Sequence, residues 1–241
     1  MKKLFALLLI LLLSSVVFAH GDEAEALQEQ IYKENPLLGF IYDNPPPNFL
    51  LIGLVLTIGI LAFSIFFQEA INEKHKKILF ALIVISIALP TLYLAFATVY
   101  ENLTSVTGGP VHWHADFEIF VCGDELELKE SEGLEGKVGT ELVHAHNDYR
   151  IHVEGTLLSM SQASLGNFFS AIGGEMTDDS LEVRLTDGTV GDWHNNDLCS
   201  DGRKGSWKMY INDVQQDFNP DYVISPFANV PPGDHIKLVF E

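Results

Sequence analysis

The sequence is short of basic residues, and this shortage excludes one large class of partners. Its 241 residues include 14 Lys and Arg against 33 Asp and Glu, which gives a formal net charge of −19. The imbalance lies in residues 101–241, which hold 25 of the acidic residues and 8 of the basic ones. No basic patch is available to contact phosphates, so we expect no nucleic acid partner.

Several catalytic signatures are also missing. The sequence has no nucleophile motif, no glycine-rich phosphate loop and no dinucleotide-binding fingerprint. These absences give no support to an enzyme of the corresponding types, and they leave metal-dependent catalysis open.

Residues 1–19 have the features of a secretory signal peptide. Lys2 and Lys3 precede an apolar run that ends in Val17-Phe18-Ala19, a small-x-small pattern typical of a cleavage site. The alternative is an uncleaved anchor helix. The apolar run is short and a cleavage site follows it, so we predict cleavage after Ala19.

Two further stretches carry no charge and predict transmembrane helices. They cover residues 49–67 and 78–100, which are 19 and 23 residues long. Each is long enough to cross about 30 Å of hydrocarbon at about 1.5 Å per residue. A buried hairpin of a soluble protein is the alternative, but two such runs around a short charged loop favour the membrane. Pro90 lies inside the second run and is expected to kink it.

The charges between these runs predict the orientation in the cell membrane. The loop 68–77 contains Lys74, Lys76 and Lys77 and is therefore expected to be cytoplasmic. Residues 20–48 then form a short extracytoplasmic segment, and its run of three prolines is expected to make the chain rigid and end this segment just before the membrane. Residues 101–241 form an extracytoplasmic domain, in which the sequon at Asn102 would be accessible for glycosylation.

The outer domain has the pattern of an α+β fold. Leu165, Phe168, Phe169 and Ile172 are spaced as on one face of a helix, and Ser164 is a suitable N-cap. Alternating or apolar segments predict strands over residues 111–121, 142–146, 150–154, 181–185, 206–211 and 235–240. We therefore expect a mainly β domain with one packed helix.

The only two cysteines, Cys122 and Cys199, both lie in this domain. Outside the cytoplasm we expect them to form a disulfide. The alternative is a cysteine ligand in a copper site. Neither cysteine has a histidine a few residues downstream, as a cupredoxin would, so the disulfide is favoured.

Five of the nine histidines fall within two short segments. Residues 111–123 read VHWHADFEIFVCG, and residues 143–155 read VHAHNDYRIHVEG. Because side chains alternate along a strand, each H-x-H pair lies on one face, and a turn at Asn147-Asp148-Tyr149 would fold the second segment into a hairpin. Neutral imidazoles bind Cu²⁺ and Zn²⁺, so we predict a metal site rather than a merely polar face. The expected ligands are His112, His114, His144, His146 and His152.

Four carboxylates near these histidines are expected to orient the rings, and one of them could be a direct ligand: Asp116, Glu118, Asp148 and Glu154. His20 would become the mature N-terminus, where its α-amine and imidazole could chelate Cu²⁺. Many signal cleavages simply precede a polar residue, and this is the favoured interpretation of His20. His194 and His235 are isolated in the sequence and are expected to be surface or turn residues.

A resemblance to a known group of proteins rests on segments of residues 109–241. They are HWHADFEIFVCG, HAHNDYRIHVEG, SLGNFFSAIGG and WKMYINDVQ followed by PPGDHIKLVF. They are similar to a group of secreted or membrane-anchored archaeal and bacterial proteins with paired H-x-H strands and an LG-x-FF helix. The resemblance implies no particular activity. The strand–helix–strand order, with a turn at Ile211-Asn212-Asp213, is also similar to a β-grasp domain.

A second resemblance is to cupins, which implies a small β-barrel and a metal-dependent enzyme. HWHADFE is similar to the first cupin motif, with Glu118 four residues after His114. However, Gly123 follows too early, and Pro232-Gly233-Asp234-His235 has the wrong spacing for the second motif.

Three functions are consistent with these features. We favour a membrane-tethered extracytoplasmic module that binds copper or zinc for metal capture or homeostasis. The alternatives are a cupin-like metal-dependent oxygenase or isomerase, and a surface interaction domain without metal, whose histidines serve structure or pH response. The two apolar runs contain no intramembrane charge, so we read them as an anchor in the lipid bilayer. Through it the chain could also contact a second copy or another membrane protein.

Overall fold

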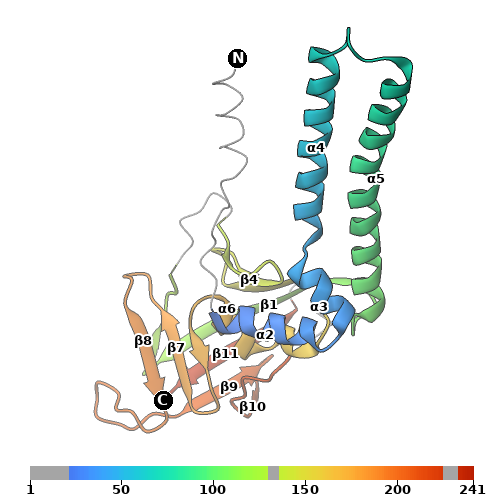
Figure 1. The fold of residues 1–241 in the computed structure, drawn as a ribbon. Coiled ribbons are helices and arrows are strands. Elements are labelled where there is room, and N and C mark those ends of the chain that lie inside the picture. Colours follow the sequence, from blue (N-terminus) through green and yellow to red (C-terminus); the bar gives the residue numbers. More distant parts are fainter. Residues whose placement is uncertain (1–21, 130–135, 225–232) are drawn as a thin grey trace.

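A computed structural model of the chain describes residues 22–129, 136–224 and 233–241. The predicted signal peptide and His20 lie outside these residues. Two long helices, α4 (Pro46–Phe66) and α5 (Glu73–Thr104), are long and apolar enough to cross a membrane by length and composition. They run side by side away from the rest of the chain (Figure 1). Most of their large apolar side chains are exposed, as expected for helices that meet lipid.

Small residues bring α4 and α5 into close contact. A Cβ at Gly53 would collide with the backbone carbonyl of Ser86 and with the ring of Pro90. Thr57 Oγ1 lies 2.7 Å from Ser86 Oγ, so the hydroxyl groups join the helices at the same level. Such small and hydroxyl-bearing residues are typical of helix interfaces in membranes.

The structure shows helices in the segments on either side of these spans. Residues 20–48 were expected as a short segment ending in a proline stop, but they contain α2 (Asp22–Lys33) and α3 (Pro36–Asp43). Pro46 begins α4 instead of stopping the chain, because the first turn of a helix needs no backbone N–H there. Much of the expected loop 68–77 is helical, since the Asn72 side chain caps α5 at the backbone N–H of His75.

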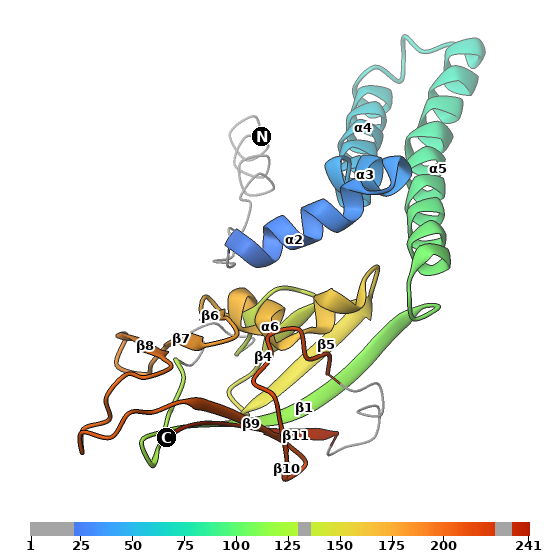
Figure 2. The ribbon, with the colours of Figure 1, turned by 90° about the horizontal axis from the view of Figure 1, so that it is seen from below.

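The helices α2 and α3 connect the long helices to the outer domain. The Tyr32 hydroxyl donates to Glu101 Oε1 at 3.2 Å, and the Tyr93 hydroxyl donates to the Asn44 carbonyl at 2.7 Å. Ala24 of α2 is buried in the core of the outer domain. Figure 2 shows α2 beside α6, with the sheet on the other side of α6. The outer domain therefore uses residues that precede the long helices in sequence.

One large sheet forms the outer domain. Its strand order is β10-β9-β11-β1-β5-β4-β3, and β2 pairs with the end of β1. β11 and β1 are parallel, and the other neighbours are antiparallel. The strands are β1 (Pro110–Val121), β2 (Asp124–Glu125), β3 (Val138–Gly139), β4 (Val143–Ala145), β5 (Arg150–Thr156), β9 (Trp207–Ile211), β10 (Val214–Gln216) and β11 (Asp234–Phe240).

The buried face of this sheet packs against the predicted helix. The 3-10 helix η1 (Met160–Ala163) leads into α6 (Leu165–Ala171), where the Ser164 side chain accepts from the Asn167 backbone N–H, as predicted. Phe168 and Phe169 are buried together with alternate residues of β1, β5, β9 and β11. A separate small sheet contains β6 (Glu175–Met176), β7 (Ser180–Arg184) and β8 (Val190–His194).

The expected α+β class and its single packed helix are confirmed. The six predicted strands correspond to β1, β4, β5, β7, β9 and β11, with boundaries that differ by one or two residues at most. Within the described residues the large sheet is open, because its outer strands β10 and β3 do not pair with each other. This arrangement does not support the barrel alternative.

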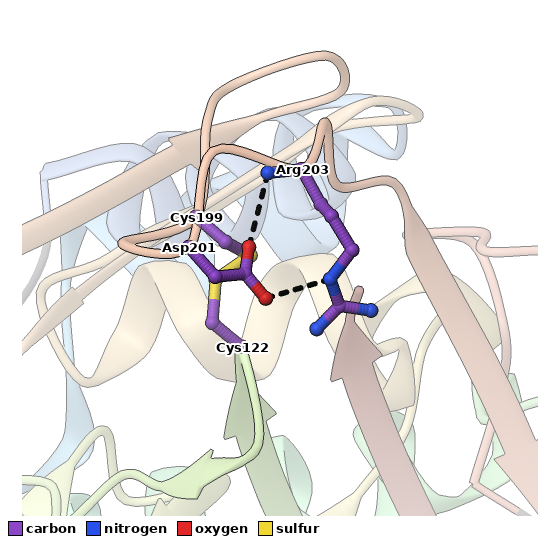
Figure 3. Close-up of a disulfide and its surroundings, with 4 residues drawn as sticks. All are labelled: Cys122, Cys199, Asp201 and Arg203. Atoms are coloured by element: carbon purple, nitrogen blue, oxygen red, sulfur yellow. Dashed lines mark hydrogen bonds and ion pairs between the residues drawn. A yellow bond between two sulfur atoms is a disulfide. The ribbon is translucent and has the colours of Figure 1, made fainter.

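The predicted disulfide joins Cys122, after β1, to Cys199, after β8 (Figure 3). The two Cα atoms are 5.7 Å apart, and the bond closes a sequence separation of 77 residues. Asp201 and Arg203 form an ion pair in the same loop. Because both cysteines are in the disulfide, neither is free to bind a metal, and the alternative of a cysteine ligand is wrong.

Candidate metal centre

The alternation along β1 separates a buried face from a polar face. Trp113, Ala115 and Phe117 are buried in the core, whereas His112 and His114 lie on the opposite face of the strand. This follows from the two-residue period of a strand. The apolar residues fix the orientation of β1, and the histidines are placed by that packing.

The strand pairing then aligns histidines from three neighbouring strands. His114 of β1 lies opposite His152 of β5, and His152 lies opposite His144 of β4. Residues that lie opposite one another in antiparallel strands point to the same face of the sheet. His146, two residues after His144, follows on the same side. The hairpin expected from the sequence is present, since β4 and β5 pair on either side of the turn at residues 146–149.

The five rings form one continuous cluster. His112 Nε2 is 2.9 Å from His114 Nε2, and the ring centroids of His114 and His152 are 4.7 Å apart. His144 stacks on His152 with centroids 5.5 Å apart, and His146 meets His152 edge to face at 4.9 Å. His152 is therefore at the centre of the cluster.

Two groups of side chains in this cluster could hold a metal ion. One contains His112, His114, His152 and Glu154, and the other contains His144, His146 and His152. In each group the ligand atoms all lie within 4.8 Å of one another. His152 belongs to both groups.

Two of the four expected carboxylates contact the cluster. Glu154 Oε1 is 3.3 Å from His112 Nε2 and 3.8 Å from His152 Nδ1. Asp148 Oδ2 is 3.2 Å from His152 Nε2. Glu154 is thus placed as a ligand or as an acceptor, and Asp148 is placed to orient the His152 ring.

The other two carboxylates have different partners, which corrects the expectation that they orient the histidines. Asp116 accepts a hydrogen bond of 2.6 Å from Arg150 Nε. Glu118 lies 3.3 Å from His235 Nε2 and 3.9 Å from Lys237 Nζ, because β1 pairs with β11 at this level. His235, which is isolated in the sequence and was expected to be a surface or turn residue, lies against Glu118 because of the parallel pairing.

Burial keeps two of the rings neutral. His144 is only 2% exposed, and this burial, together with the charge of Lys137, lowers its pKa to about 4. The backbone of Gly139 on β3 contributes to the burial, because a Cβ there would lie 2.8 Å from the Cα of His144. Burial also lowers the pKa of His114, with further contributions from the neighbouring rings of His152 and His112. A neutral imidazole is the form that binds a metal ion.

Three buried nitrogen atoms of the cluster have no hydrogen-bond partner. They are the Nδ1 atoms of His114, His144 and His152. Buried polar atoms are hydrogen-bonded in the great majority of cases, and an exception often marks a bound ion or water. All three unpartnered atoms fall within the row of opposed histidines.

The remaining predicted sites lie elsewhere. Asn102 is in the last turn of α5, where its Oδ1 accepts a 3.0 Å hydrogen bond from Thr156 Oγ1, and its glycosylation stays a prediction. His194 is on β8 with Asp192 as its neighbour, apart from the cluster.

Comparisons with known proteins add no family to this description. No protein-family model matches the sequence, and searches of curated proteins and of solved structures found no significant match. The function must therefore be inferred from the residues and their arrangement.

Proposed function

We propose that the chain is a membrane-tethered extracytoplasmic module that binds a divalent transition metal ion, copper or zinc, for metal capture or homeostasis. The proposal rests on the row formed by His114, His152 and His144. Each of these rings has a buried Nδ1 without a partner, and each lies against another ring of the cluster. A metal ion would satisfy the Nδ1 atoms of His152 and His144, while His114 turns its other ring nitrogen, Nε2, toward His112 in the same cluster.

The chemistry of the donor set supports copper or zinc. Imidazole nitrogens with one carboxylate suit these ions, and the set lacks the many oxygen ligands that Ca²⁺ and Mg²⁺ require. The pKa of His144 and that of His114 are lowered, so both rings are uncharged at neutral pH, and each has one nitrogen whose lone pair can bind a metal ion.

Three features support the proposed location. The two long apolar helices suit a membrane anchor, the charged end at Lys74, Lys76 and Lys77 suits the cytoplasm, and the disulfide suits an oxidising compartment. The open sheet topology, with two antiparallel pairs around the parallel pair β1 and β11, supports the β-grasp resemblance. The cupin-like enzyme is the weaker alternative, because the open sheet gives it no barrel.

The test is the metal content of the full chain, purified in detergent without a histidine tag. We would strip it with chelator, dialyse it against equal concentrations of Cu²⁺, Zn²⁺, Ni²⁺ and Fe²⁺, remove free metal and count bound metal by mass spectrometry. We expect stoichiometric copper or zinc. The variant His114→Ala/His152→Ala should lose it.

A matched control is His194→Ala, which removes a histidine outside the cluster. It should bind as much metal as the parent chain. A second background, His20→Ala, separates binding at the predicted mature N-terminus from binding at the cluster. If the parent chain retains no stoichiometric metal, the proposal is wrong and the polar face is a surface for another partner.

A further inference from the structure

We infer that the cluster holds two metal ions, one on each side of His152, with the imidazole ring of this residue bridging them. The inference rests on the proposed metal binding and specifies its architecture. His152 is the one residue shared by the two ligand groups found among the described residues. It also lies at the centre of the row across β1, β5 and β4.

The first ion would lie between β1 and β5. His112 Nε2 is 2.9 Å from His114 Nε2 and 3.3 Å from Glu154 Oε1. Atoms that bind one ion at about 2.0–2.1 Å lie roughly 2.8–3.4 Å apart, depending on the angle at the metal. The two distances from His112 Nε2 are already of that size, and the ligand atoms of the whole group lie within 4.8 Å of one another. His152 Nδ1, which has no hydrogen-bond partner, lies 3.8 Å from the same Glu154 oxygen.

The second ion would lie on the other side of the ring. His152 Nε2 points toward Asp148, whose Oδ2 is 3.2 Å away. The rings of His144 and His146 both contact His152, and the Nδ1 of His144 is buried without a partner. His144, His146 and His152 form the second ligand group, and in the inferred arrangement the Nε2 of His152 serves this ion, with Asp148 as a neighbouring carboxylate.

The charges of the site are compatible with two divalent ions. A bridging ring uses both nitrogens, so His152 must release its remaining ring proton to solvent when the second ion binds. The resulting imidazolate, with Glu154 and Asp148, places three negative charges around the two ions. Arg150, whose charge acts on His114, is paired with Asp116.

Copper titration of the full chain, in detergent and on the His20→Ala background, tests the bridge. We expect two Cu²⁺ per chain by mass spectrometry. An imidazolate bridge couples the unpaired electrons of the two ions. The paramagnetic resonance signal per copper should therefore be full after one equivalent and fall sharply after the second.

Three variants separate the two positions. His146→Ala, which truncates a half-buried ring, should bind one Cu²⁺ with a full, uncoupled signal, and His144→Ala/His146→Ala should do the same. His112→Ala/Glu154→Ala removes two of the four members of the other group and should also leave one uncoupled ion. Tryptophan emission identifies any variant that has lost its fold, because all three tryptophans lie in residues 101–241. If a double variant has lost its fold, the copper count and the signal of the single variant His146→Ala decide whether there are two positions.

Each outcome has a defined meaning. Two coupled ions in the parent chain support the bridge. If the parent chain binds one ion, and this ion is lost both in the His144 and His146 variants and in His112→Ala/Glu154→Ala, the two-ion arrangement is wrong while the proposed metal binding stands. Two ions with full signal intensity overturn the bridge. No ion at all would overturn the proposed function together with this inference.

Discussion

Acid should destabilise the metal-free outer domain through His144. The ordinary pKa of a histidine is 6.5, and burial lowers that of His144 to about 4 in the folded chain. The unfolded chain therefore binds the proton more readily between these two pH values. The free energy of unfolding should fall as the pH is lowered through 6.5 and should level off below about 4.

The size of this effect can be estimated from the pKa shift. One pKa unit corresponds to about 1.4 kcal/mol. Protonation of His144 should therefore lower the free energy of unfolding by about 2 kcal/mol at pH 5, and by roughly 3 kcal/mol once the pH is below both pKa values. Its side chain is only 2% exposed, so solvent screening reduces the effect little. The charged or titratable neighbours that act on it are Lys137, Glu154, His152 and His146.

The assay is urea unfolding of the chelator-treated full chain in detergent, followed by tryptophan fluorescence. The three tryptophans, at positions 113, 193 and 207, all report on the outer domain. The control His144→Asn has no titratable group at this position. Between pH 7.5 and pH 5, the free energy of unfolding of the parent chain should fall by about 2 kcal/mol more than that of this variant. Equal losses in both chains would show that the His144 ring is not buried in its neutral form.

Three further results should follow. Replacing Cys122 and Cys199 by serine should lower the free energy of unfolding by about 4.5 kcal/mol in the chain-entropy model, because the bond closes a sequence separation of 77 residues. Unchanged urea midpoints would contradict this. Gly53→Val should separate α4 from α5 and lower their melting temperature by circular dichroism, whereas Gly59→Val, which has open space around its Cβ, should not. A cysteine in place of His75 should react with a membrane-impermeant maleimide only after cells are permeabilised, and labelling of intact cells would reverse the proposed orientation.

The parts of the site that were predictable are those governed by short-range patterns. The alternation around His112 and His114 fixed their common face, and the turn after His146 fixed the hairpin that returns His152 to His144. Both features depend on residues close together in sequence. The sequence alone did not determine that His112 and His114 lie beside this hairpin, because no local pattern requires β1 to pair with β5.

The errors came from long-range pairing and from unusual helix starts. Glu118 looked like part of the histidine site until β11, more than a hundred residues later, placed His235 and Lys237 beside it. No helix was predicted within residues 20–48, where the structure has α2 and α3. Pro36 and Pro46 occupy first-turn positions that tolerate proline.

The central claim is that imidazoles of this cluster bind a metal ion, and X-ray absorption at the zinc edge tests it most directly. The full chain, carrying His20→Ala and loaded with Zn²⁺, should show nitrogen or oxygen ligands at about 2.0–2.1 Å with the outer-shell scattering that imidazole rings produce. This scattering should weaken in His114→Ala/His152→Ala and stay unchanged in His194→Ala. A zinc environment of oxygen ligands alone, or one indifferent to the loss of His114 and His152, would contradict the account.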